Sequence, residues 1–295
     1  MIAFLISIAL LLPAPAWAHA VADGTAGHWN ADPLVLVPMV TVAGLYAIGT
    51  ASLWRRAGVG RGVPVWRAHL FALGIVALIV ALVSPLDPSA DVSFALHMVQ
   101  HMLLVVVAAP LIALGQGGVA LLRAIGAPMR RPVASMRHLR RMVATVPVAT
   151  VLHGATIWIW HAPGPYQAAI ADDLIHYLEH LSMFATGVLF WWSAFNAGRQ
   201  APLGYGAGVA AMFVTMIHTG MLGILITLAP APLYATYAAA EPLLGLSALE
   251  DQQLAGIIML LPGGIAYLAG GLALLAAWLA AAEHRRPDRV QGPVT

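Results

Sequence analysis

The sequence predicts an all-α protein: a polytopic transmembrane bundle of about seven helices after an N-terminal signal peptide, with its N-terminus outside and its C-terminus inside. Three observations support this fold class. Hydrophobic residues make up 61% of the 295 positions and charged residues only 9%, whereas soluble domains carry roughly 25% charged residues. Apolar stretches near the length of about 20 residues that spans a bilayer recur along the chain. The charges between these stretches alternate in sign.

The first 18 residues are predicted to form a signal peptide. Residues 1–18 contain an apolar run that is short for a span and end in the triplet Ala16-Trp17-Ala18. Small residues at the first and third of these positions are typical of a cleavage site. Cleavage would leave residues 19–32 as a periplasmic tail that begins with His19. The alternative is an uncleaved additional helix.

Seven apolar stretches follow and define a transmembrane domain over residues 33–282. A cytoplasmic tail, residues 283–295, completes the chain. Each stretch is near the length that a membrane-spanning helix requires. Their approximate limits are 33–53, 66–86, 94–115, 142–162, 174–195, 206–229 and 254–281.

The loop charges predict the orientation of these stretches. Every second loop is rich in arginine, and such loops stay in the cytoplasm. One missed span would break the alternation, so it supports the count of seven independently of hydropathy. The small net charge of +2 then reflects loop bias, and no nucleic-acid partner is expected. The arginines are Arg55, Arg56, Arg61, Arg67, Arg123, Arg130, Arg131, Arg137, Arg140, Arg141, Arg199, Arg285, Arg286 and Arg289, and the acidic residues of the intervening segments are Asp23, Asp32, Asp87, Asp91, Asp172, Asp173, Glu241, Glu250 and Asp251.

The composition also limits the metal chemistry of the chain. It contains no cysteine, which excludes disulfides, thiolate metal sites, iron–sulfur clusters and cysteine nucleophiles. His, Met, Asp and Glu remain as metal ligands.

Histidines are concentrated in the apolar stretches. An ionisable side chain at membrane depth is costly, so its default interpretation is functional and inward-facing. The third and fifth stretches both run inward and open with HMVQH and HYLEH. In each motif the i, i+4 spacing puts both imidazoles on one helix face, which Gln100 or Glu179 at i+3 shares. Seven of the twelve histidines are involved: His97, His101, His153, His161, His176, His180 and His218.

Five of these histidines should lie at one depth near the outer surface, because the fourth stretch runs outward and ends in His161. We expect His97, His101, His161, His176 and His180 to form a metal site there. Other possible ligands are His153, about two turns deeper, and His218 and Met216 near the middle of the sixth stretch. If cleavage follows Ala18, the free amine and imidazole of His19 could chelate Cu(II), unless His19 is simply where the cut falls.

Other interpretations of these residues stay open. A single histidine in a span commonly makes an interhelical hydrogen bond, and methionine commonly fills gaps in a core. The HxxEH pattern of His176, Glu179 and His180 matches that of inverzincin zinc proteases, although a protease needs a third ligand and an open coordination position. Gln100 in the companion motif cannot act as a base. A bis-histidine haem between the third and fifth helices also fits this spacing.

Several segments resemble the CtaG-type cytochrome c oxidase assembly factors, which are polytopic bacterial membrane proteins. They are HMVQHMLLVVVAAPLIALG, IWIWHAPGPYQAA, HYLEHLSMFATGVLFWW, LITLAPAPLYATY and DQQLAGIIMLLPGGIAYL, and they occur in this order within residues 35–280. The absence of cysteine excludes the single-span copper chaperones that share the CtaG name.

The resemblance implies a multi-pass protein of the plasma (inner) membrane that is needed to make active haem–copper oxidase. It implies copper as the cofactor or cargo, and oxidase subunits or other copper carriers as partners, besides membrane lipid. Its motif positions in this chain are His97, Gln100, His101, Trp160, His161, Tyr166, His176, Glu179, His180, Asp251 and Gln252. Glu179, Gln100 and Asp251 are expected to support the metal ligands rather than bind metal themselves.

The sequence therefore favours a metal-handling assembly factor, acting as a metallochaperone, over an enzyme. Imidazoles suit copper and zinc, and thioethers suit Cu(I), so zinc and haem remain alternatives to copper. A copper transporter would need ligands that continue to the inner face. The histidines instead become sparse beyond His153 and His218, which favours a site open to the periplasm only.

Overall fold

The computed structural model describes residues 28–125, 145–200, 204–238 and 244–283 of the chain. These ranges form helices and connecting turns without any strand, which confirms the all-α class for this part of the protein. Helices occupy each of the seven apolar stretches. The expected signal peptide, His19 and the tail after residue 283 lie outside the described residues, so cleavage stays a prediction.

Six long helical segments and one shorter helix correspond to the seven stretches. They are α2 (Pro33–Ala57), α3 (Val65–Leu82), the continuous run of α5 (Phe94–Met102), π-helical η2 (Leu103–Ala108) and α6 (Ala109–Leu114), then α10 (Val146–Trp160), α12 (Asp173–Gln200), α13 (Gly204–Thr227) and α15 (Ala248–Glu283). In the connections that the structure describes there are four short helices: α4 (Leu86–Ala90), α7 (Gly117–Ala124), α11 (Pro163–Ala171) and α14 (Ala235–Ala238).

Five helical segments among the described residues are long and apolar enough to cross a membrane: α2, α3, the run Phe94–Leu114, α13 and α15. Helix α10 is apolar but shorter. Helix α12 has 28 residues but is absent from this set, because His176, Glu179, His180 and other polar residues lower its mean hydropathy. The chain is thus a membrane protein, and the count of seven spans stays a prediction.

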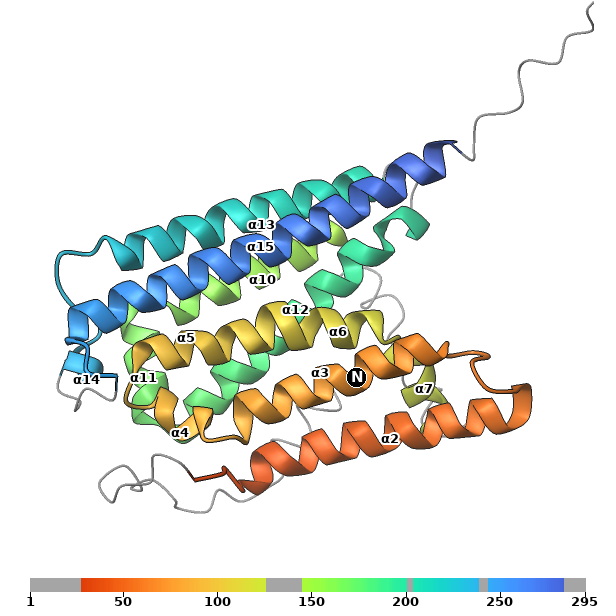
Figure 1. Cartoon of the computed structure of the whole chain (residues 1–295), viewed down its shortest axis with the longest axis horizontal. Helices are drawn as coiled ribbons and strands as arrows, with labels where there is room; N and C mark the ends of the chain where they lie inside the picture. The colour runs from red at the N-terminus through yellow and green to blue at the C-terminus, as the bar shows by residue number, and fades with distance from the viewer. Residues whose placement is uncertain (1–27, 126–144, 201–203, 239–243, 284–295) are drawn as a thin grey trace, which may run out of the picture.

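The long helices lie roughly side by side (Figure 1). Helices α2 and α3 form one side of the bundle, α13 and α15 form the other, and α5–α6, α10 and α12 lie between them. Glycine allows α13 and α15 to approach closely, since a Cβ on Gly256 would lie only 2.6 Å from the carbonyl oxygen of Gly223. Three short helices, α4, α11 and α14, lie at the same end of the bundle, which we call the α11 end.

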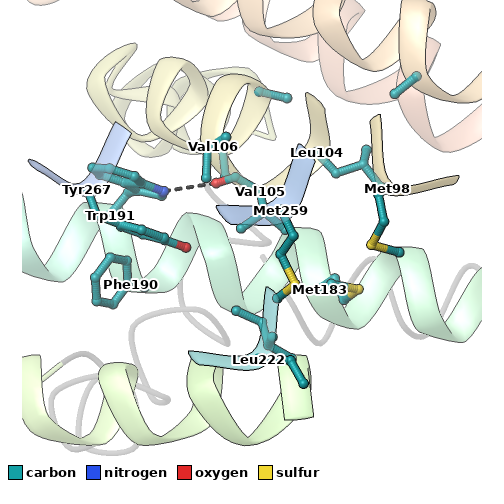
Figure 2. Close-up of a cluster of buried hydrophobic side chains, with 14 of the residues drawn as sticks. Met98, Leu104, Val105, Val106, Met183, Phe190, Trp191, Leu222, Met259 and Tyr267 are labelled. Carbon is teal, nitrogen blue, oxygen red and sulfur yellow. Dashed lines mark hydrogen bonds between the residues drawn. The ribbon is translucent and has the colours of Figure 1, made fainter. Parts of the chain in front are cut away.

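The π-helical segment is held in the core by an aromatic side chain of α12. The i→i+5 pattern of a π-helix interrupts the regular α-helical hydrogen bonding. The indole N–H of Trp191 donates to the carbonyl oxygen of Val105 at 2.9 Å (Figure 2). Trp191 also stacks on Tyr267 of α15, with ring centroids 5.4 Å apart and planes 7° apart. These two contacts of Trp191 join η2, α12 and α15 in the interior of the bundle, away from the α11 end.

Most charged residues in the described ranges separate towards opposite ends of the helices, although Glu283 ends α15 and Glu179 lies within α12. Asp32 is the N-cap of α2 at the α11 end, whereas Arg55 and Arg56 occupy the last turn of that helix. Asp173 and Asp251 lie in the first turns of α12 and α15. The separation agrees with the expected alternation of loop charges. Which end faces the cytoplasm stays a prediction, and the arginines at 130–141 and 285–289 lie outside the described residues.

We expect the α11 end to face the periplasm. The chain has no cysteine, so a single cysteine can be introduced at exposed Asp172 or at exposed Arg61. In cells whose outer membrane is permeabilised, Asp172→Cys should react with a membrane-impermeant thiol reagent, and Arg61→Cys should react only after the inner membrane is opened. The reverse labelling pattern would overturn this orientation.

Candidate metal centre

Three helices bring histidines together at the α11 end. Helix α5 contributes His97 and His101, and α12 contributes His176 and His180. Each pair is separated by one helical turn and shares a helix face, and the ring centroids within each pair are 4.3 Å apart. His161 follows directly after the last residue of α10. The repeated i, i+4 spacing therefore positions both pairs without any special backbone geometry.

Contacts between helices join these side chains into one cluster. The His97 ring lies 5.3 Å from the His176 ring and 5.6 Å from the His180 ring, measured between centroids. The His101 ring lies 5.4 Å from His180 and 5.7 Å from His161. All five imidazoles that the sequence places at one depth thus lie side by side. Whether they bind a metal stays a prediction.

The closest potential ligands are His97, His101, Glu179 and His180. One donor atom from each lies within 4.8 Å of the other three, and all four residues are buried. The Nε2 atoms of His97 and His101 are 2.9 Å apart, and the Glu179 carboxylate oxygens lie 3.8 and 3.6 Å from them. Donors bound to one ion at about 2.0–2.1 Å lie at most about 4.2 Å apart. Small side-chain movements would therefore bring this donor set, which we call the His–Glu cluster, onto one ion.

The hydrogen bonding of the cluster also fits a bound cation. Nine buried side-chain polar atoms in the described residues lack a hydrogen-bond partner, and six of them belong to His101, His161, His176, Glu179 and His180. Both carboxylate oxygens of Glu179 are included. A buried carboxylate without a partner is strongly unfavourable, and most buried polar groups are paired. A cation bound at this point would pair with several of these nitrogen and oxygen atoms at once.

Neighbouring groups orient two of the imidazoles towards the cluster. The Nδ1 of His161 lies 2.7 Å from the carbonyl oxygen of Ile157, which can only accept, so Nδ1 carries the proton and Nε2 keeps its lone pair. The hydroxyl of Tyr237 donates to the Ala90 carbonyl oxygen at 3.0 Å, and its oxygen lies 3.2 Å from Nδ1 of His97. The Nε2 of His97 then carries the lone pair, which faces Nε2 of His101 at 2.9 Å. Metal-binding histidines commonly have such a partner on the other ring nitrogen.

Aromatic residues cover the cluster at the α11 end. Tyr166 of α11 is buried, and its ring centroid lies 5.3 Å from that of His97. The hydroxyls of Tyr166 and Tyr237 are 2.9 Å apart, and the Tyr234 hydroxyl donates to the His161 carbonyl oxygen at 2.8 Å. The residue-by-residue sequence argument missed Tyr234 and Tyr237. The signal was present, since both belong to the segment LITLAPAPLYATY.

The other motif residues hold the helices around the cluster. Asp251 accepts hydrogen bonds from the Ser93 hydroxyl at 2.8 Å and the Phe94 N–H at 2.7 Å, which fixes the start of α5. The Gln252 side chain accepts from the Leu233 N–H at 2.6 Å, beside Tyr234. Trp160 donates to Ser182 of α12 at 2.7 Å and so ties the end of α10 to that helix. These residues position ligands and do not lie among the four closest donors.

Gln100 differs from the expectation that it lies beside the imidazoles. Its amide nitrogen donates to the Ala81 carbonyl oxygen at 2.9 Å and to Asp87 Oδ1 at 2.6 Å. Position i+3 starts near the histidine face, but the flexible side chain turns to polar acceptors at the end of α3 and in α4. Within the described residues Gln100 makes no hydrogen bond with an imidazole.

The deeper candidates have partners of their own. His153 lies 3.0 Å from the Tyr267 hydroxyl through Nε2 and 3.4 Å from the Thr186 hydroxyl through Nδ1, which fits the interhelical hydrogen bonds of membrane proteins. The Nδ1 of His218 accepts from the Trp158 indole at 3.3 Å. Met216 packs against the main hydrophobic core. None of the three belongs to the His–Glu cluster.

Comparisons with known proteins place the chain in a known group. A family described as the cytochrome c oxidase caa3 assembly factor (Caa3_CtaG) matches residues 44–281. The uncharacterized proteins Mb0105 of Mycobacterium bovis and MT0111 of Mycobacterium tuberculosis are each 25% identical over an alignment of 243 residues that covers 77% of this chain. The aligned region is 36% of each relative, so the chain spans well under half of their length. No solved structure gives a significant match.

Replacing Asp251 tests its role in fixing α5. Asp251→Ala would leave the buried Ser93 hydroxyl and Phe94 N–H without an acceptor. This should lower the free energy of unfolding by about 1–3 kcal/mol. The thermal unfolding temperature of the purified protein should fall clearly. The matched control is Glu283→Ala, because Glu283 is exposed at the end of α15 and such changes usually stay within about 0.5 kcal/mol. Equal effects of the two substitutions would contradict this role.

Two acidic residues between α3 and α5 make stability depend on pH. Burial raises the pKa of Asp87 to about 6. Burial, with the nearby charges of Asp87 and Asp173, raises the pKa of Asp91 to about 7 from its ordinary 3.8. Ionisation of Asp91 therefore lowers the free energy of unfolding. The loss is complete above about pH 7, and it becomes smaller as the pH falls towards 3.8, the pKa of an ordinary aspartate in the unfolded chain.

Asp91→Asn should consequently raise the unfolding temperature at pH 8, with a gain that shrinks as the pH is lowered from 7 to 5. Differential scanning of the chelator-treated protein at a series of pH values measures this. A gain that does not change with pH would show that the charge of Asp91 is not its cause.

Proposed function

The chain belongs to the cytochrome c oxidase caa3 assembly factor family, and we propose that it supports oxidase assembly by binding copper at the His–Glu cluster. His97, His101, His180 and Glu179 are the primary ligands in this proposal. His176 and His161 adjoin them on either side and take part in receiving or releasing the ion. The partners would be subunits of a haem–copper oxidase or other copper carriers.

One observation carries the proposal: Glu179 is completely buried among imidazoles and neither of its oxygens has a hydrogen-bond partner. A cation balances this carboxylate and uses the imidazole lone pairs at the same time. Interhelical hydrogen bonding alone leaves both Glu179 oxygens unsatisfied, so it accounts for the cluster less completely.

The donor set favours copper handling over catalysis. A zinc protease needs an open coordination position reached by a polypeptide, whereas His97, His101 and Glu179 have no exposed surface. A bis-histidine haem would use two imidazoles and leave Glu179 and three further histidines without a role. Zinc shares the preference for imidazole, and metal analysis distinguishes it from copper.

The position of the cluster supports delivery on one side of the membrane. The cluster lies at the α11 end, and the charge pattern supports a periplasmic position for that end. A transporter needs ligands that continue across the membrane. Both ring nitrogens of His153, the next histidine inward, instead lie within hydrogen-bonding distance of hydroxyl groups.

The proposal predicts that His180→Ala removes most of the copper that purifies with the protein and lowers oxidase activity in cells that depend on it, while the protein still accumulates. His69→Ala is the matched control, since His69 is an exposed histidine of α3 outside the cluster. Glu179→Gln keeps the size of the side chain but removes its charge, and should weaken copper retention, because the amide oxygen does not balance the charge of the ion.

Copper content measured by mass spectrometry and oxidase activity measured in membranes give the two readouts. Retention of copper by His180→Ala at the His69→Ala level would overturn the metal site. Normal oxidase activity during copper-limited growth in a strain lacking the protein would overturn the assembly function.

A further inference from the structure

A small cavity lies next to the His–Glu cluster, farther from the α11 end. It is lined by three methionines from three helices: Met102 at the end of α5, Met183 of α12 and Met259 of α15. Met102 follows His101 directly, and Met183 comes three residues after His180, about 4.5 Å farther along the helix axis. In Figure 2, Met183 and Met259 extend from their helices towards the same region.

His161 links this cavity to the His–Glu cluster. Its side chain lines the cavity, and its ring centroid lies 5.7 Å from that of His101. Its Nδ1 is occupied by the Ile157 carbonyl oxygen, and its buried Nε2 has no hydrogen-bond partner. One imidazole without a partner on Nε2 therefore lines the same cavity as three methionine side chains.

Packing alone accounts for these methionines less well than for others in the chain. Methionine often fills gaps in a core, and Met212 is a buried example that packs around Gly270 and Gly271. Around this cavity, by contrast, three thioethers and one unpaired imidazole come from four different segments. The cavity is also bordered by Val105 and Val106 of the π-helical segment, and π-helical turns are frequent at functional sites.

We propose that Met102, Met183, Met259 and Nε2 of His161 form a second metal subsite, selective for Cu(I). Thioethers are soft ligands that favour Cu(I), whereas imidazole and carboxylate also accept Cu(II) and Zn(II). The ion moves between the two sites by exchange of ligands at His101 and His161, with no change of oxidation state. This inference rests on the proposed function, because it makes the subsite a step in handling the same copper.

Silver ion tests the subsite separately from the His–Glu cluster, because Ag(I) is a soft monovalent ion that does not change oxidation state. The test variant of the full chain carries Met102→Leu, Met183→Leu and Met259→Leu. The matched control carries Met98→Leu and Met212→Leu, which replace buried methionines that do not line the cavity. Ag(I) and Zn(II) affinities are measured by titration of each purified protein.

The triple variant should bind Ag(I) at least about tenfold more weakly than the wild type, while the control variant binds it normally. Zn(II) binding should be the same in all three proteins, which shows that the triple variant is folded. X-ray absorption of the Ag(I)-loaded wild type should show sulfur neighbours that the triple variant lacks. Unchanged Ag(I) affinity in the triple variant, or a loss equal to that of the control variant, would overturn the subsite.

The same titrations separate this inference from the proposed function. Loss of Zn(II) and Cu(II) binding in His180→Ala with Ag(I) binding retained supports two distinct sites. If the wild type binds neither Zn(II) nor Cu(II) but the triple variant still loses Ag(I), the His–Glu cluster of the proposed function fails and the methionine subsite stands.

Discussion

Burial of the Glu179 carboxylate beside the imidazoles of His97, His101 and His180 is the constraint on which the rest of the site depends. Glu179 has no exposed surface and no hydrogen-bond partner for either oxygen. Such a group is stable in a helix bundle where it is protonated or where a cation reaches it. The Nε2 atoms of His97 and His101 lie 3.8 and 3.6 Å from its oxygens, so one cation can contact all three groups. The cluster is thus organised around a carboxyl group whose two oxygens the surrounding protein leaves without hydrogen-bond partners.

The surrounding helices hold the ligands through contacts at the α11 end. Asp251 fixes the first turn of α5 and thereby the His97–His101 pair. Tyr237 occupies Nδ1 of His97, and Ile157 occupies Nδ1 of His161. These partners set which ring nitrogen has a free lone pair, as in the ligand shells of metal proteins. The arrangement also places the methionine cavity next to His161, so a harder and a softer donor set lie beside each other.

Local periodicity and charge pattern made much of this structure predictable from the sequence. The i, i+4 spacing of HMVQH and HYLEH determines that each pair shares a face, and the charge alternation places both pairs at one end. The contacts of Gln100 were not predictable, because a flexible side chain selects partners on helices that are distant in sequence. Nor did local pattern indicate the π-helical turn after Met102 or the convergence of Met183 and Met259, since both depend on how whole helices pack. Tyr237 reaches His97 across 140 residues, and only the family-like segment that contains it offered a signal.

The most direct test of the common site is the position of copper in crystals of the copper-loaded full chain, located by anomalous diffraction at the copper absorption edge. The account predicts a peak between His97, His101, His180 and Glu179, with ligand distances of about 2.0–2.2 Å for nitrogen and oxygen. Copper located elsewhere in the chain, with the Glu179 carboxylate satisfied by protein or water hydrogen bonds alone, would contradict it.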